Sequence, residues 1–234
     1  MQQLKQFSQV MSDEIGRPLH PKMIRRVLRR NGFVWKRLRK SLRGERDPVL
    51  FEFFQKELEQ LKQMALEEEI ALYYLDETGL NLNPHAPYGW QLRGSTSELP
   101  AQRGESKTII GYFSPIKQHL EAVIFEGAAD ALCVIEVINQ LANQIERKTI
   151  LVLDQATIHT AAIVKRNIPR WKQKGLYLQF LPAHSPELNL IEILWKHLKH
   201  FWLKLQDYQS LDTLSAAAAG ILKNYGKHYA ISFE

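Results

Sequence analysis

The sequence is poor in the features that mark secreted, disulfide-linked and membrane proteins. Its 234 residues include a single cysteine, Cys133, so no disulfide can form within the chain, as is typical of a reducing compartment. No apolar run approaches the roughly 18 residues that a membrane-spanning helix needs. The first residues also lack the apolar segment of a signal peptide. These absences predict a cytoplasmic protein.

Two common kinds of active site are missing as well. No Gly-x-Ser-x-Gly motif is present, which argues against a serine nucleophile on a nucleophile elbow. The histidines are scattered and the cysteine stands alone, so a zinc site is not favoured. A hydrophobic content of 45% with 24% charged residues is ordinary for a globular protein. The length fits one domain with an appendage, or two small domains.

Positive charge is concentrated near the N-terminus. The formal net charge is +6, yet residues 22–46 hold eleven Lys or Arg residues against one acid, Glu45. A basic block on an otherwise mildly acidic body indicates a polyanionic partner. Interleaved apolar residues such as Ile24, Leu28 and Trp35 argue against a disordered tail.

Residues 1–46 have the pattern of a small DNA-binding segment. Apolar spacing predicts helices over 3–15 and 20–31, the second ending at Asn31-Gly32, with a candidate wing strand over 33–37. This order indicates a helix-turn-helix with a wing, whose second helix enters the major groove while flanking cations hold phosphates. The alternative is a basic helical hairpin that only packs. The candidate DNA-binding residues are Arg25, Arg26, Arg29, Arg30, Lys36, Arg37, Arg39 and Lys40.

The rest of the chain reads as a linker helix, within residues 47–69, followed by an α/β domain over residues 70–234. Apolar runs predict strands that alternate with amphipathic helices, and the second and third strands form a hairpin. This order predicts a mixed sheet with helices on its faces. The predicted strands are 70–75, 107–114, 119–125, 149–153 and 176–181; the predicted helices are 51–69, 130–147, 160–173, 186–204 and 211–229.

Three acids are expected to meet at one edge of this sheet. Asp76 and Asp154 each end an apolar strand, at the rim where open α/β folds bind ligands. Glu192 falls on the second turn of a helix that begins at Pro186 and has Ser185 as its N-cap. Clustered carboxylates suit Mg²⁺, and a metal pair about 3.5–4 Å apart can activate a water or a 3′-hydroxyl for phosphodiester chemistry.

Each acid has an ordinary alternative when it is considered alone. An isolated aspartate at a strand end is more often a turn or cap residue than a metal ligand. Two nearby acids compete for the role. The two-residue periodicity of strands places Glu77 on the side opposite to Asp76. Glu187 lies in a first helical turn, where a negative charge favours the helix dipole.

Three motifs, in order, resemble the catalytic blocks of the DDE transposases. They are YLDETG (residues 74–79), LDQATIH (153–159) and LPAHSPELNLIEILW (181–195), with 37 residues between the second and third acids. The third motif is the longest and most specific. The set resembles in particular the bacterial insertion-sequence branch of the mariner superfamily, and the resemblance covers essentially the whole chain.

The resemblance implies a ribonuclease-H-like catalytic domain over residues 70–234. It also implies that Asp76, Asp154 and Glu192 are the catalytic, metal-binding triad holding a pair of Mg²⁺ or Mn²⁺ ions, with His159 near the site. The implied reaction is DNA cleavage at transposon ends and strand transfer into target DNA. The implied partners are double-stranded DNA and a second copy in a homodimer, with no membrane. The implied location is the bacterial cytoplasm, at the nucleoid when DNA is bound.

The sequence departs from the family pattern at three places. Gln155 stands where the family usually has Asn, and Leu190 where it usually has Pro; we expect both to tune the chemistry rather than abolish it. Family members usually carry another helix-turn-helix ahead of the one predicted here, so the chain is expected to be N-terminally short. Two alternatives stay open: a truncated, non-catalytic DNA-binding remnant or regulator of a full-length transposase, and another nuclease of the same fold, such as a resolvase or ribonuclease H.

Overall fold

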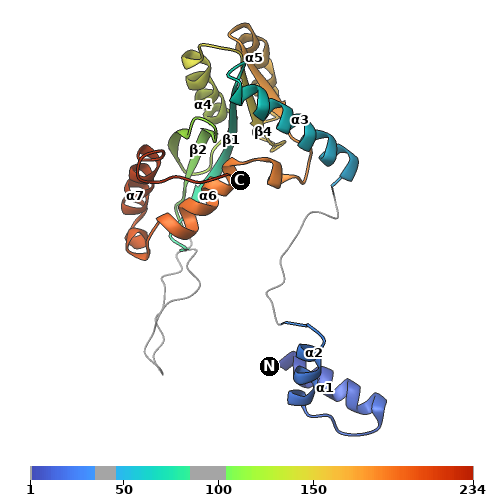
Figure 1. Ribbon diagram of the computed structural model, residues 1–234. Helices are drawn as coiled ribbons and strands as arrows, with labels where there is room; N and C mark the ends of the chain where they lie inside the picture. Colours follow the sequence, from blue (N-terminus) through green and yellow to red (C-terminus); the bar gives the residue numbers. More distant parts are fainter. Residues whose placement is uncertain (1, 35–45, 85–103, 234) are drawn as a thin grey trace. The chain divides into compact units, whose positions relative to one another are not determined.

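The computed structural model describes residues 2–34, 46–84 and 104–233 (Figure 1). The chain divides into two compact units, residues 1–41 and 42–234. Among the described residues, no helix is long and apolar enough to cross a membrane.

The first unit is a pair of helices, α1 (Gln2–Ile15) and α2 (Pro21–Arg30), as the sequence predicts. Pro21 at the first turn of α2 suits a position whose N–H has no helical partner. The helix stops at Asn31, and Gly32 then adopts a φ of +78°, as at many helix ends.

The wing predicted over residues 33–37 is not confirmed. Phe33 and Val34 belong to no strand, and residues 35–37 lie outside the described residues. The predicted DNA-binding residues Lys36, Arg37, Arg39 and Lys40 also lie outside them.

The second unit is built on a five-stranded mixed sheet with the strand order β3-β2-β1-β4-β5. The first three strands pair antiparallel, whereas β4 pairs parallel with both β1 and β5. This arrangement confirms the predicted mixed sheet and the predicted hairpin. The strands are β1 (Ala71–Leu80), β2 (Lys107–Ser114), β3 (His119–Glu126), β4 (Thr149–Leu153) and β5 (Leu176–Phe180).

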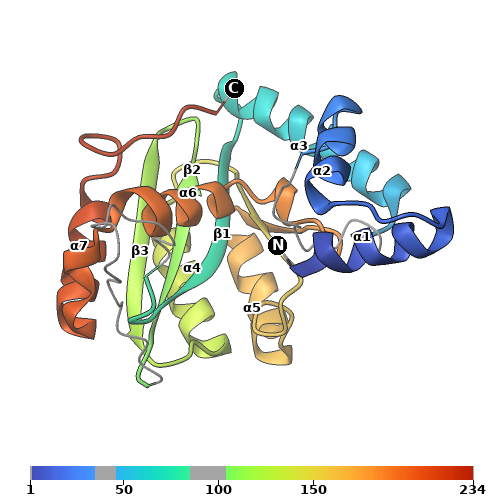
Figure 2. The same ribbon diagram turned by 90° about the horizontal axis from the view of Figure 1, so that it is seen from below.

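Helices cover both faces of the sheet (Figures 1 and 2), because alternate residues of its central strands are apolar on either side. Leu72 and Val152 face a core that includes α3, α6 and α7. Leu75 and Leu151 face a second core against α4 and α5. The helices are α3 (Pro48–Leu66), α4 (Ala131–Gln144), α5 (Ala162–Gln173), α6 (Ile191–His197) and α7 (Leu211–Lys223).

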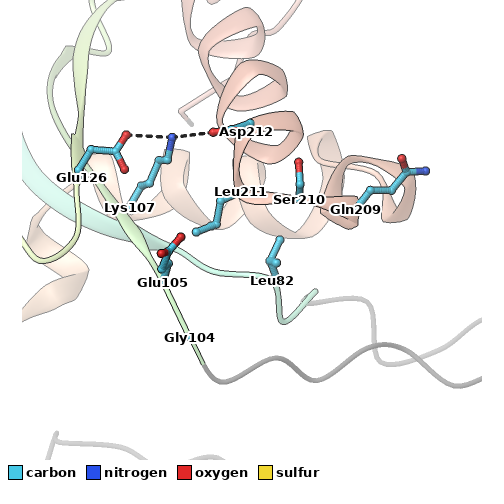
Figure 3. A pocket seen from close by; sticks show the side chains of 9 residues that line it. All are labelled: Leu82, Gly104, Glu105, Lys107, Glu126, Gln209, Ser210, Leu211 and Asp212. Carbon is cyan, nitrogen blue, oxygen red and sulfur yellow. Dashed lines mark hydrogen bonds and ion pairs between the residues drawn. The ribbon is translucent and has the colours of Figure 1, made fainter.

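An ion-pair bridge fixes the start of α7 against the sheet (Figure 3). The Lys107 ammonium on β2 lies 2.9 Å from Glu126 on β3 and 3.3 Å from Asp212 in the first turn of α7. Ser210 caps this helix by accepting the Thr213 N–H at 3.1 Å. Sheet and helix are thereby joined at the end of β2 that follows the undescribed residues 85–103.

Two predicted boundaries near the acids are wrong. The strand predicted to end before Asp76 continues to Leu80, because β1 keeps its pairing with β2 after its pairing with β4 has stopped. The helix predicted over 186–204 is broken into a 3₁₀ turn, η1 (Pro186–Leu188), then α6, then a π-helical turn, η2 (Leu198–Trp202). The break lies at Asn189, whose backbone is extended.

Three other helix boundaries shift by a few residues. The helix α3 starts at Pro48 rather than 51, because Asp47 caps it by accepting the N–H groups of Val49 and Leu50. It packs into the core of the second unit through Leu58 and Ala65. The helix α7 ends at Lys223 rather than 229, and α4 ends at Gln144 rather than 147.

Candidate active site

The three predicted acids line one pocket at the edge of the sheet. They come from three separate elements: Asp76 from β1, Asp154 from the residue after β4, and Glu192 from α6. The structure therefore brings together residues that are far apart in the sequence. The pocket is lined by Asp76, Glu77, Thr78, Asp154, Glu192, Trp195, Lys196, Lys199 and His200.

Asp76 is the most buried of the three acids, with 7% of its surface exposed. The parallel pairing of β1 with β4 ends at Tyr74 and Val152, whereas the antiparallel pairing with β2 continues with Asp76 opposite Gly111. Asp76 thus lies just past the point where two central strands separate. Such a point opens a crevice in an otherwise closed sheet.

The surroundings of Asp76 disfavour its negative charge. Burial, followed by the charges of Glu77, Glu192 and Asp154, raises the pKa of Asp76 to about 8, against the effect of a backbone hydrogen bond. Near neutral pH this carboxyl group holds a proton unless a cation offsets the surrounding negative charge.

Asp154 is held by a buried histidine. The Asp154 Oδ1 atom lies 2.6 Å from His159 Nδ1 and also accepts the Ala156 N–H at 3.0 Å. Burial disfavours ionisation of Asp154, but the hydrogen bonds from His159 and Ala156 and the imidazole charge outweigh it and lower the pKa of Asp154. Among the described residues these hydrogen bonds go to Oδ1, which leaves Oδ2 for a cation.

His159 connects two acids that come from different strands. It is fully buried, and its Nε2 atom lies 3.1 Å from Glu77 Oε2. Burial opposes its positive charge, yet its contacts with Asp154 and Glu77 raise the pKa of His159 to about 9. The predicted place of His159 near the site agrees with this position. Strand periodicity predicts Glu77 on the side opposite to Asp76, yet Glu77 lines the same pocket and its charge acts on Asp76.

Glu192 lies in the first turn of α6, not in the second turn of a longer helix as predicted. Ser185 stands at the N-cap position, as predicted, but of the short turn η1, and its side chain makes no capping hydrogen bond there. Burial and the charges of Asp154 and Glu77 raise the pKa of Glu192, with Lys199 opposing them.

Lys199 is a pocket residue that the sequence analysis missed. Burial lowers its pKa, while the charges of Asp76 and Glu192 act in the opposite direction. Its position was available in the sequence, because Lys196 and Lys199 follow Glu192 at steps of four and seven residues, which lie on one helical face. A cation therefore stands beside the acids without neutralising them.

Trp195 fixes α6 against the sheet beside Asp76. A Cβ atom on Gly111 would lie 3.2 Å from the tryptophan ring and 3.0 Å from both Ala122 and the Glu121 carbonyl. A glycine opposite Asp76 allows this close approach without a shift of its neighbours. The 4% exposure of Trp195 agrees with a packing role.

The donor set suits a hard divalent cation. Within the described residues no three His, Cys, Asp or Glu side chains already form a metal-binding cluster. The pocket nevertheless offers carboxylate oxygens, the ligands that Mg²⁺ and Mn²⁺ prefer. Their mutual repulsion at Asp76 is the kind of cost that a bound cation relieves. The residues present therefore fit the metal that the motifs imply.

The basic residues predicted to bind DNA lie in the first unit. Arg25, Arg26, Arg29 and Arg30 are all exposed on α2. Ile24 is the buried residue of this helix. The surface of α2 is therefore strongly positive and accessible to a polyanion.

The sequence is similar to an endonuclease family, to a protein of a bacterial insertion element and to an uncharacterized bacterial protein. A family model described as "DDE superfamily endonuclease" matches residues 71–215. An "Insertion element IS630 uncharacterized 39 kDa protein" from Shigella sonnei is 27% identical over 197 residues, or 78% of this chain and 52% of that protein. An uncharacterized protein from Sinorhizobium fredii is 36% identical over 72 residues, or 30% of this chain and 49% of that protein. The chain spans about half the length of these relatives.

Solved structures share the fold. The strand transfer complex of Mos1 matches 91% of this chain and 64% of its own, with a TM-score of 0.62 and 13% identity. A pre-cleavage Mos1 transpososome matches 92% and 66%, with a TM-score of 0.63 and 14% identity. Together with the strand order, these matches confirm the predicted ribonuclease-H-like arrangement of the second unit.

Proposed function

The chain belongs to the DDE superfamily endonuclease family, and from that premise we propose that it is a transposase that cuts and joins DNA with Asp76, Asp154 and Glu192. The resemblance of the motifs to mariner and insertion-sequence transposases is confirmed at the level of the family. The observation that carries the proposal is the meeting of the three acids in one pocket.

The proposed cofactor is a pair of Mg²⁺ or Mn²⁺ ions held by the three carboxylates. When bound, the ions supply the Lewis acidity that activates a water or a 3′-hydroxyl and stabilises the leaving oxygen of the phosphodiester. Asp154 would bind through Oδ2, since Oδ1 is taken by His159 and Ala156. Asp76 would release its proton on binding, because its pKa is about 8 without a cation.

Other pocket residues orient and balance the charges of the site. His159 holds the Asp154 carboxylate in one orientation through its Nδ1 atom, as carboxylate–histidine pairs do beside metal ions. Lys199 places a positive charge beside Asp76 and Glu192. An ammonium in this place favours the approach of an anionic phosphodiester to a pocket that is otherwise negative.

The proposed substrate is double-stranded DNA, at transposon ends and at the target. The exposed arginines of α2, the second helix of the proposed helix-turn-helix segment, are the described residues best suited to contact the major groove and the phosphates beside it. The proposed division of labour is therefore DNA binding by residues 1–46 and catalysis by residues 70–234, with 47–69 between them. Pairing of two DNA ends would require two copies of the chain, in a homodimer.

The test is a nicking assay on supercoiled plasmid with Mg²⁺ or Mn²⁺. The wild-type chain is expected to nick in either ion and to lose the activity with EDTA. Asp154→Asn is expected to abolish nicking with little change in DNA affinity. Glu136→Gln, a change of the same chemistry at an exposed position of α4, is the matched control and is expected to stay active.

An Asp154→Asn protein with normal metal-dependent nicking would contradict the assignment of the triad. Tight DNA binding by the wild type without nicking in either ion would instead favour a non-catalytic DNA-binding protein. A preference for RNA–DNA hybrid over duplex DNA would favour a ribonuclease H.

A further inference from the structure

The segment that joins β5 to α6 is held at each end by a side-chain amide. At one end, Gln155 Nε2 donates to the Leu181 carbonyl at 2.9 Å. At the other end, Asn189 Nδ2 donates to the Leu75 carbonyl at 3.0 Å. Each of these hydrogen bonds involves a residue that is next to one of the acids in the sequence. Gln155 follows Asp154, and Leu75 precedes Asp76.

The hydrogen bond donated by the Asn189 side chain lies where β1 and β4 separate. Pairing between β1 and β4 ends at Tyr74 and Val152, so the next residue, Leu75, lies beyond the parallel ladder. The asparagine side chain supplies a donor to its carbonyl there. Asn189 is only 2% exposed, so water competes little for this bond, and leaving such a carbonyl unpaired is costly.

The same residue also begins the helix that carries Glu192. The Asn189 carbonyl accepts the Glu192 N–H at 3.1 Å, while its backbone conformation ends η1 and separates that turn from α6. One buried residue thus contacts the strand of Asp76 through its side chain and the first turn of α6 through its backbone. These acids are 116 positions apart in the sequence.

We propose that Asn189 and Gln155 are positioning residues, which set the spacing of Asp76, Asp154 and Glu192 by pinning the β5–α6 segment at its two ends. Neither amide needs to touch a metal or DNA for this role. The inference rests on the proposed function, because it takes the three acids as the metal-binding groups. It also gives Gln155, which departs from the usual family pattern, a contact of its own.

The two amide side chains are not expected to contribute equally to metal affinity. The bond of Asn189 is buried, whereas Gln155 is exposed at the residue level, so water can replace part of its contribution. Loss of an outer-shell partner typically weakens metal binding by about 10- to 100-fold. We expect an effect of that size for Asn189→Leu, and a smaller one of about two- to fivefold for Gln155→Leu.

The test compares these variants with Asn139→Leu in the 234-residue chain. Asn139 Oδ1 accepts the Trp171 indole N–H at 2.8 Å and joins α4 to α5, so its loss removes an amide contact between two elements away from the pocket. Mn²⁺ affinity is measured by calorimetry, and hydrogen–deuterium exchange is measured over residues 181–192. Asn189→Leu should bind Mn²⁺ about 10- to 100-fold more weakly and exchange faster in this segment, while Asn139→Leu should do neither.

The outcomes separate the inference from the proposed function. Wild-type affinity and wild-type exchange in Asn189→Leu would overturn the inference alone, as would faster exchange with unchanged Mn²⁺ affinity. A wild-type chain that binds no Mn²⁺ would overturn the proposed function and the positioning role together. If Asn189→Leu does not fold, Gln155→Leu decides by the same two measurements, and unchanged affinity there overturns the inference.

Discussion

Asp76 is a pocket residue whose surroundings strongly disfavour its charged form. Its carboxyl group is buried among three other acids, and its pKa of about 8 reflects that cost. Active sites commonly retain such unfavourable groups, because the arrangement that weakens the free protein is the one that binds the ligand. Stability and function are therefore expected to respond in opposite directions to changes at this position.

Asp76→Asn should raise the melting temperature of the metal-free chain and abolish metal-dependent nicking. On folding, Asp76 has to take up a proton or carry a charge that the neighbouring acids repel, whereas an amide of nearly the same shape needs neither. A gain of about 1 kcal/mol corresponds to a shift of about 2–4 °C in a chain of this size. Calorimetry in EDTA measures the first effect and the plasmid assay the second. A lower melting temperature would show that Asp76 stabilises the fold.

The buried His159 predicts a pH dependence of stability. Its pKa is raised from 6.5 to about 9, so the stability that its positive form contributes is fully present below pH 6.5 and is lost as pH rises through about 9. The pKa of Asp76 is raised as well, to about 8, so its protonated form also contributes stability that is lost as pH rises, over a lower range of pH. The measurement therefore uses the Asp76→Asn background, in EDTA. The melting temperature of the Asp76→Asn variant should fall as pH rises from 6.5 to 9, and adding His159→Gln should make that fall smaller. Equal slopes with and without His159 would contradict the assignment.

At this scale the sequence identified the acids but not all of their contacts. Asp76, Asp154 and Glu192 could be found because the motifs stand in order. The link from Glu77 through His159 to Asp154 could not, because it joins β1 to the segment after β4, whose path is set by tertiary packing. The two-residue periodicity of a strand predicts the face from which a side chain projects, but not the residues that it contacts there.

Among the elements, β1 and α6 differ most from what the sequence predicts. The predicted strand ends before residues 76–79 (DETG), yet these residues continue β1, because β2 supplies an antiparallel partner for them. The run from Pro186 reads as a single helix, yet the buried Asn189 side chain bonds to Leu75 and interrupts it. In both cases a partner distant in the sequence overrides the local pattern. The short apolar run of β4 was placed correctly.

The docking of α6 on the sheet depends on Gly111 and predicts a defect when it is filled. In Gly111→Ala the new Cβ atom would meet Trp195, Ala122 and the Glu121 carbonyl at 3.0–3.2 Å. Overpacking of this kind typically costs about 1–3 kcal/mol. Because Trp195 lies three residues after Glu192, nicking should fall as well. Gly79→Ala is the matched control, since its Cβ would meet nothing within 4 Å. Urea denaturation and the nicking assay measure the two effects, and equal stability of both variants would contradict the tight contact.

At the scale of the whole molecule, charge is divided between the two parts of the chain. Residues 22–46 carry the strong positive charge, whereas four acids outnumber two lysines in the lining of the pocket of the second unit. An acidic pocket repels DNA, so affinity for a polyanion has to come from cations placed elsewhere. Binding of DNA and binding of metal should therefore be separable by substitution.

Replacing Arg25, Arg26, Arg29 and Arg30 together by Ala should weaken DNA binding while leaving Mn²⁺ affinity unchanged. Each lost phosphate contact is expected to reduce the slope of log K against log salt by about 0.9. Fluorescence anisotropy over a series of salt concentrations measures the slope. The matched control replaces four exposed cations of α5, namely Lys165, Arg166, Arg170 and Lys172, and so removes the same net charge. If both variants lose affinity and slope equally, binding follows net charge, and the α2 surface is not the DNA site. A loss confined to the α2 variant, with Mn²⁺ affinity preserved, assigns DNA binding to the first unit.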